Sequence, residues 1–142
     1  RPTMAGSDYV LTEFSGATDF AFARERVYEL VTHGFIPIIA HVERYPNIRK
    51  DMGNLETLRE IGAYLQVNAE SILGEEGFAT KRFCKKLMKN NMLDFVGTDC
   101  HRTNKRIPNL GPCAEYMEKK MGREYTERIL IHNPQKIIEN IG

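Results

Sequence analysis

Four side chains of this sequence have the chemistry of divalent-metal ligands, and each follows a short apolar run. Asp99 and His101 stand two residues apart after one such run, so both can point into one cavity, because alternate residues of an extended chain share a face. His41 follows a second run and Glu13 a third. Imidazole and carboxylate groups bind Mn²⁺, Fe²⁺ and Zn²⁺, and a bound metal supplies hydroxide near neutral pH. Together these residues indicate a hydrolytic metal site.

Two arginines lie just beyond the histidines of these stretches. Arg44 comes shortly after His41, and Arg106 shortly after His101. A guanidinium group carries a permanent charge and parallel N–H donors, which suit a phosphate dianion. Metal, hydroxide and arginine together favour phosphoester hydrolysis over deacetylation or peptide cleavage.

Each of these residues also has an ordinary structural interpretation. A single histidine is more often hydrogen-bonded within a fold than a metal ligand, and an arginine is more often a surface ion-pair partner. Glu13 is as readily an edge acid as a ligand, and Asn68 can satisfy a loop backbone. We interpret His33 and His132, near the ends of predicted helices, as structural. What favours a metal and phosphate site is that the side chains able to bind such ligands follow predicted strands.

Cys100 and Arg106 also match the C-x5-R spacing of cysteine-dependent phosphatases. In that chemistry a thiolate attacks phosphorus from a loop whose backbone N–H groups surround the phosphate. No glycine lies between Cys100 and Arg106 to let such a loop wrap tightly, so this is the weaker alternative. It predicts that Cys100→Ser abolishes activity.

The elements that must position these residues follow from apolar spacing. Apolar runs predict strands at residues 9–14, 35–40, 63–68 and 92–98. Amphipathic spacing predicts helices at residues 18–33, 54–62, 80–89, 111–121, 124–131 and 134–141. The alternation indicates an α/β fold with parallel strands and a helical C-terminus. Because parallel strands share one carboxyl edge, that edge would bring the metal-ligand candidates together.

Local signals refine this scheme. The expected helix starts are Thr18 or Asp19, Asn54, Thr80, and Asn133 followed by Pro134. Pro37 argues against a central place in the sheet for the second strand, because proline has no N–H to donate. The cations of the helix at residues 80–89 are interpreted as a solvated face rather than a binding patch. They are Lys81, Arg82, Lys85, Lys86 and Lys89.

Composition narrows the functional class. With 142 residues, of which 42% are apolar and 27% charged, the chain is expected to form a single domain over residues 1–142. A net charge of +1 gives no broad electrostatic case for nucleic acid or an anionic membrane, and no apolar run is long enough for membrane insertion. The cysteines, Cys84, Cys100 and Cys113, form no CxxC pair and are interpreted as reduced thiols of a cytoplasmic protein.

Five stretches, taken together, carry a family resemblance. They are residues 10–14 (VLTEF), 38–45 (IIAHVERY), 66–68 (QVN), 98–101 (TDCH) and 133–138 (NPQKII). In this order and at these separations they resemble the PHP-type, manganese-dependent tyrosine-protein phosphatases of bacterial capsule and exopolysaccharide operons. The stretch at residues 41–45 is fairly specific to this branch, whereas Asp-x-His is shared across PHP phosphoesterases.

The resemblance implies the C-terminal part of a distorted TIM-like (PHP) barrel, with a multinuclear metal site at the strand ends. The residues that would bind the metal are Glu13, His41, Asp99 and His101. Manganese is the metal implied, with Fe²⁺, Zn²⁺ or Mg²⁺ as alternatives. Arg44 and Arg106 would contact the phosphate and assist catalysis. The implied substrate is phosphotyrosine on the tail of a bacterial tyrosine kinase that controls polysaccharide synthesis.

One part of the family pattern has no counterpart in this sequence, namely an N-terminal strand carrying His-x-His. We therefore expect the chain to be poorly active alone or to form a homo-oligomer. Two alternatives stay open. One is a PHP phosphatase of small phosphate monoesters, similar to histidinol phosphatase, and the other is a non-catalytic fragment that binds the kinase tail.

Overall fold

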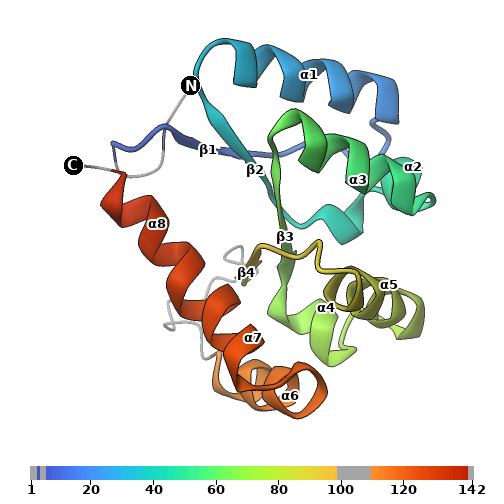
Figure 1. Ribbon diagram of the computed structural model, residues 1–142. Helices are drawn as coiled ribbons and strands as arrows, with labels where there is room; N and C mark the ends of the chain where they lie inside the picture. The colour runs from blue at the N-terminus through green and yellow to red at the C-terminus, as the bar shows by residue number, and fades with distance from the viewer. Residues whose placement is uncertain (1–2, 4–5, 99–109, 141–142) are drawn as a thin grey trace, which may run out of the picture.

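A parallel sheet organises the computed structural model, which describes residues 3, 6–98 and 110–140. Its strands lie side by side in chain order: β1 (Tyr9–Thr12), β2 (Ile36–Ile39), β3 (Tyr64–Asn68) and β4 (Phe95–Gly97) (Figure 1). Every pairing is parallel. Each strand lies within a range predicted from the sequence, so the α/β prediction is confirmed.

Helices alternate with the strands and then close the chain. The helices between strands are α1 (Phe20–Thr32), α2 (Pro46–Arg49), α3 (Met52–Ile61), α4 (Ala69–Leu73) and α5 (Phe78–Lys89), with a 3₁₀ turn, η1 (Val42–Arg44). The closing run is α6 (Gly111–Met121), α7 (Arg123–Glu127), the π-helical turn η2 (Arg128–His132) and α8 (Asn133–Glu139). Across the described ranges, no helix is both long and apolar enough for a membrane crossing.

Two of the predicted helix starts are wrong, and one is right. Asp19 caps α1, where its carboxylate accepts from the Phe22 N–H at 2.8 Å. The cap of α3 is Asp51 rather than Asn54, since Asn54 uses its amide to bond the carbonyl of residue 48. Helix α5 starts at Phe78, so Thr80 lies inside it. The short helices α2 and α4 were not expected, because four or five residues are too few for a periodic pattern.

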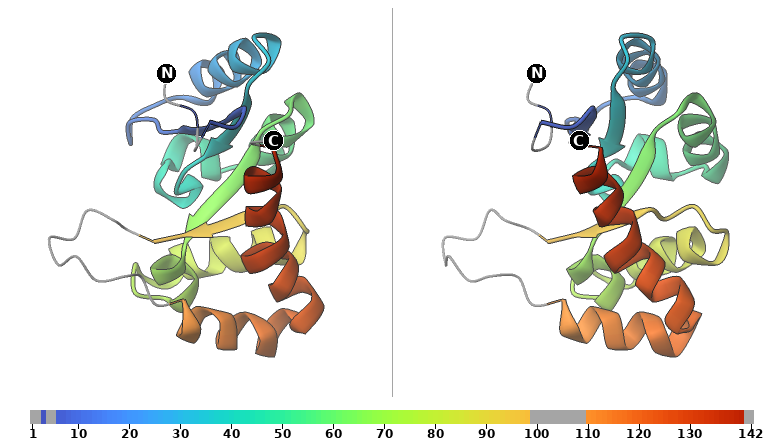
Figure 2. Two further views of the ribbon diagram at one scale, coloured as in Figure 1. Left: turned by 90° about the vertical axis from the view of Figure 1, so that its left-hand side faces the viewer. Right: turned by 60° about the vertical axis from the view of Figure 1, so that its left-hand side comes forward.

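The sheet has a thick core on one face and a thin one on the other. The main core joins the strands to α1, α3 and α5 through fully buried side chains such as Val27, Leu58 and Leu87. On the other face Tyr9, Ile38 and Phe95 form a small cluster against α8. Figures 1 and 2 show α8, drawn in red, on the opposite side of the strands from α1 and α3.

Pro37 lies in a central strand, contrary to the prediction. The N–H groups of Ile36 and Ala40 donate toward the β1 side. Successive N–H groups of a strand point in opposite directions, so the Pro37 nitrogen faces β3. The β2–β3 ladder starts only at Ile38 opposite Tyr64 and has two residue pairs. Proline is tolerated because it lies just outside this ladder.

The predicted capping role of Asn133 is wrong, although α8 does begin at this residue. Asn133 has helical backbone angles and continues the turn η2 directly into α8. Pro134 has no N–H and would crowd a tight helical turn, and the wider π-helical turn directly precedes it. The Asn133 side chain does not cap the helix and instead donates a hydrogen bond to the buried Asp94 carbonyl at 2.8 Å. This bond ties the helical C-terminus to the start of β4.

Candidate metal and phosphate site

The carboxyl ends of the parallel strands meet at one edge, and Glu13 and His41 converge there. Glu13 follows β1 and His41 follows β2, which is the direct neighbour of β1. The His41 Nε2 atom lies 3.5 Å from Glu13 Oε1. The side chains are 18% and 56% exposed, respectively, so both can be reached by solvent. The structure thus brings together two of the predicted metal ligands, one nitrogen donor and one oxygen donor.

The other predicted ligands, Asp99 and His101, lie outside the described residues, and so does Arg106. Strand β4 ends at Gly97, and Thr98 is the last described residue on that side. Within residues 3, 6–98 and 110–140 there is no cluster of three or more metal-ligating side chains.

The backbone at His41 adopts an uncommon conformation. With φ 37° and ψ 56°, His41 is in the left-handed region at the start of η1. This conformation costs a non-glycine residue on the order of 1 kcal/mol or more, and such strain concentrates at functional sites. The turn places the imidazole over the strand edge, where its ring lies 5.5 Å from the Tyr45 ring.

Tyr45 holds the segment after β1 against the segment after β2. Its side chain is buried at 1% exposure, and its hydroxyl accepts a hydrogen bond from the Phe14 N–H at 3.0 Å. The Phe14 and Tyr45 rings also pack edge to face. Because Glu13 immediately precedes Phe14, this contact fixes where the Glu13 carboxylate can reach. Sequence reasoning noted Tyr45 only within a motif and missed this positioning role.

Replacing Tyr45 by phenylalanine tests this contact through its pH dependence. Burial raises the pKa of Tyr45 to about 12, whereas the unfolded chain ionises near pH 10. Between these values only the unfolded state loses the proton, so the wild-type free energy of unfolding falls as pH rises. Tyr45→Phe removes the ionisable hydroxyl and with it this pH dependence. At pH 8 the substitution should lower the free energy of unfolding by about 1 kcal/mol, because the Phe14 N–H loses its acceptor.

The measurement is urea unfolding of both proteins at pH 8 and pH 11. The gap between wild type and Tyr45→Phe should shrink or reverse at pH 11. The buried groups Tyr125 and Cys113, whose pKa values are also raised, are common to both proteins and cancel in the difference. A gap that stays constant across this range would contradict the assignment.

Glu43 ties the end of β2 to the end of β3. Its carboxylate is 2% exposed and accepts from the Asn68 N–H at 3.0 Å and from the Ser71 hydroxyl at 2.5 Å. This joins the two central strands at the edge where the candidate ligands lie. In the sequence Glu43 stands only within the stretch at residues 41–45, and nothing in that pattern predicts that it is buried.

Three buried polar atoms at this edge have no hydrogen-bond partner among the described residues. They are His41 Nδ1, Glu43 Oε1 and Asn68 Nδ2. Buried polar atoms are nearly always satisfied in native folds, so such atoms indicate a further polar species, such as an ion or ordered water. The donor chemistry of Glu13 and His41 fits a divalent metal. The local structure therefore agrees with the predicted metal site.

Arg44 lies next to Glu43 on η1, with its side chain 34% exposed. Its guanidinium Nη2 atom lies 3.7 Å from Glu76 Oε1, which belongs to the loop before α5. Arg44 is therefore held near the strand edge and remains accessible. Its predicted role in binding phosphate stays a prediction.

The remaining predicted alternatives can be placed in part. His33 ends α1 exposed, with Nδ1 2.7 Å from the Glu29 carbonyl, as a structural histidine should be. Cys84 and Cys113 are free and buried, and burial raises the pKa of both thiols. Cys100 lies outside the described residues.

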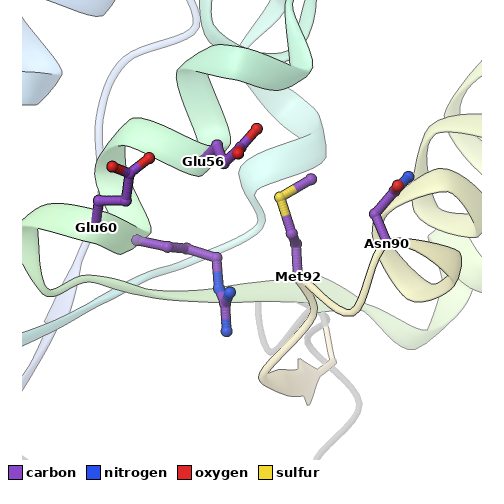
Figure 3. A pocket seen from close by; sticks show the side chains of 5 residues that line it. Glu56, Glu60, Asn90 and Met92 are labelled. Carbon is purple, nitrogen blue, oxygen red and sulfur yellow. The ribbon is translucent and has the colours of Figure 1, made fainter.

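A hollow of about 470 Å³ lies at the opposite edge of the sheet, near the amino ends of β3 and β4. Figure 3 shows it between α3, which carries Glu56 and Glu60, and the segment with Asn90 and Met92. The hollow contains none of the predicted ligands. Its guanidinium, from Arg59, forms an ion pair with the buried Asp94. We therefore place the candidate site at the carboxyl edge.

Comparisons with known proteins point to one family. A family profile described as "Capsular polysaccharide synthesis, CpsB/CapC" matches residues 1–139. The tyrosine-protein phosphatase CpsB of Streptococcus agalactiae is 28% identical over 98% of this chain and 59% of the relative. The tyrosine-protein phosphatase YwqE of Bacillus subtilis is 32% identical over 93% of this chain and 52% of the relative. The chain thus spans little more than half the length of these relatives.

A solved structure of two proteins with these names also resembles this chain. It is described as belonging to YwqE from Bacillus subtilis and CpsB from Streptococcus pneumoniae, "unique metal-dependent tyrosine phosphatases". It superposes with a TM-score of 0.86 at 29% identity, over 99% of this chain and 56% of that chain. The likeness extends across both the sheet and the closing helices.

Proposed function

The chain belongs to the CpsB/CapC family of capsular polysaccharide synthesis, and from this premise we propose that it carries a metal-dependent protein-tyrosine phosphatase site. The observation that carries the proposal is the convergence of His41 and Glu13 at the carboxyl edge of the sheet. The relatives that bear the name tyrosine-protein phosphatase align with nearly the whole chain. The metal-dependent neighbour has the same fold.

In this proposal the histidines among the candidate ligands would supply imidazole nitrogen to the metal, and the acidic residues would supply carboxylate oxygen. The residues are Glu13, His41, Asp99 and His101. Manganese is the ion we propose, with Fe²⁺, Zn²⁺ and Mg²⁺ as alternatives of similar ligand preference. When bound, such an ion supplies Lewis-acid activation and hydroxide near neutral pH.

The side chains of this chain do the remaining work. Arg44 and Arg106 bind the phosphate oxygens through guanidinium N–H groups and offset their negative charge. Tyr45 and Glu43 position the ligand-bearing segments through the Phe14 and Asn68 N–H groups. The proposed substrate is phosphotyrosine on the tail of a bacterial tyrosine kinase that acts in polysaccharide synthesis, and the proposed location is the cytoplasm.

The decisive experiment measures hydrolysis of a phosphotyrosyl peptide with and without Mn²⁺, using wild type, Asp99→Ala and Cys100→Ser. We expect turnover, low for this chain alone, that requires Mn²⁺ and falls at least about 100-fold in Asp99→Ala, because removing a metal ligand costs more than altering a group that only surrounds it. Cys100→Ser should retain activity. Turnover without metal that disappears in Cys100→Ser would replace this proposal with the thiolate mechanism.

A parallel assay with small phosphate monoesters tests the substrate class. The named relatives are tyrosine-protein phosphatases, so we expect the phosphotyrosyl peptide to be hydrolysed more efficiently than histidinol phosphate. A preference for the small ester would instead support the alternative function, a PHP phosphatase of small phosphate monoesters.

A further inference from the structure

Helices α5 and α6 border a hollow of about 590 Å³ that is distinct from the strand edge. We call it the basic groove. Its cationic side chains are Lys81, Arg82, Lys85, Lys86, Lys89 and Lys120. The first five were interpreted from the sequence as a solvated helix face. The structure adds Lys120 from α6, which makes the cations line a hollow rather than a convex surface.

Within the part of the chain that the structure describes, none of the six side chains forms an ion pair with a carboxylate. Lys81 and Lys120 instead approach the Tyr116 ring, at 4.9 Å and 5.9 Å from its centre. Cations grouped on one face repel one another, and an anionic ligand relieves that repulsion. The chain carries a net charge of only +1, so this concentration is local.

The groove also offers apolar contact. Phe78, at the start of α5, is 79% exposed and lines the hollow together with Tyr116. An exposed aromatic beside unpaired cations suits a ligand that combines negative charge with an apolar side chain. That combination is typical of an acidic peptide and less so of a flat lipid surface.

A second hollow, of about 240 Å³, continues the basic surface along α5. It shares Arg82 and Lys86 with the basic groove and adds Lys50. Helix α5 has 12 residues, so its axis is about 18 Å long. An extended peptide of about six residues spans that length.

The basic groove begins close to the candidate active site. Phe78 follows the loop that carries Glu76, and Glu76 lies 3.7 Å from Arg44 at the strand edge. A protein chain with its phosphotyrosine at that edge could therefore extend along α5.

We propose that the basic groove binds an acidic segment of the phosphotyrosyl protein substrate, with an apolar side chain of that segment against Phe78 and Tyr116. This inference rests on the proposed phosphatase function. It names the substrate feature that the enzyme selects outside the phosphate itself.

The first test is direct binding, which needs no catalysis. The probe is a fluorescein-labelled, unphosphorylated ten-residue peptide of Glu and Asp with one central Phe, titrated by fluorescence anisotropy. We expect Arg82→Glu/Lys86→Glu to raise the Kd at least about 10-fold, because each reversal replaces attraction by repulsion. The matched control, Arg24→Glu/Lys136→Glu, makes the same change in net charge on α1 and α8 and should stay within about twofold of wild type.

Companion probes identify the ligand class. A peptide with Gln in place of Glu and Asp should not bind, and Phe78→Ala should weaken binding of the acidic peptide. Equal losses in the two double variants, after circular dichroism shows both to be folded, would overturn the proposal. Binding to vesicles of anionic phospholipid with no binding to the peptide would overturn it as well.

Kinetics then link the groove to the site. With a phosphotyrosyl peptide that has an acidic flank, Arg82→Glu/Lys86→Glu should raise KM and leave kcat unchanged. Its turnover of p-nitrophenyl phosphate should equal that of wild type. A lowered kcat with both substrates would assign these residues to the catalytic site and contradict a docking role.

Discussion

His41→Ala is expected to lower Mn²⁺-dependent hydrolysis of a phosphotyrosyl peptide by at least about 100-fold and to weaken Mn²⁺ binding by a similar factor. The side chain supplies the nitrogen donor that lies 3.5 Å from the Glu13 carboxylate. Its position depends on an uncommon left-handed backbone, and alanine supplies no donor in its place. Turnover and Mn²⁺ affinity by isothermal titration calorimetry are the two readouts.

The matched control is His33→Ala. His33 is exposed at the end of α1, and its ring contacts only the local helix carbonyl among the contacts described. This variant should keep both activity and metal affinity. If His41→Ala binds Mn²⁺ as tightly as wild type, His41 is not a ligand, and the site must be built from other residues.

Asp94→Ala is expected to destabilise the fold by about 3 kcal/mol. The Asp94 carboxylate accepts two hydrogen bonds from the Arg59 guanidinium, at 2.9 and 3.2 Å, and one from the buried Leu65 N–H at 2.9 Å. Alanine leaves both donor groups without their partner. The effect should appear as a lower urea midpoint by circular dichroism, with no change in the candidate site at the opposite edge.

Two comparisons separate the buried network from ordinary ion pairing. Asp94→Asn keeps an oxygen acceptor for one of the donors and should cost less than Asp94→Ala. Glu29→Ala removes an exposed pair with Arg26 on α1 and should change stability by no more than about 0.5 kcal/mol. A loss in Asp94→Ala as small as that in Glu29→Ala would show that Arg59 and Leu65 find other partners.

The strands and long helices were predictable because burial imposes a period on the sequence. Strand β2 is apolar throughout, as expected for a strand covered on both faces, and its residues 37–39 are buried. The sequence could not reveal which side chains find a tertiary partner. Asn133 resembles a helix cap, but it donates to the Asp94 carbonyl from a distant part of the chain. Pro37 resembles an edge residue, but the ladder on its free side starts one residue later.

For the candidate site, as for the fold, the placement of residues on strands was predictable, but their tertiary partners were not. Parallel strand order was enough to expect Glu13 and His41 at one edge, and the structure places them in contact range. The positioning roles of Tyr45 and Glu43 were not predictable, because each depends on a backbone N–H about 25 to 31 residues away in the chain. The metal-ligand roles of Glu13, His41, Asp99 and His101 remain predictions, and so do the phosphate-binding roles of Arg44 and Arg106.

The short ladder between β2 and β3 has a thermodynamic consequence. With two residue pairs, it is the shortest seam of the sheet, and the Glu43 carboxylate bridges it at the carboxyl edge. Glu13 and His41 follow strands on one side of this seam, whereas β4, which Asp99 and His101 follow in the sequence, lies on the other side. An ion held by ligands from both sides binds only when the two parts are joined. Metal binding would then stabilise the pairing of β2 with β3, and this pairing would in turn increase the affinity for the metal.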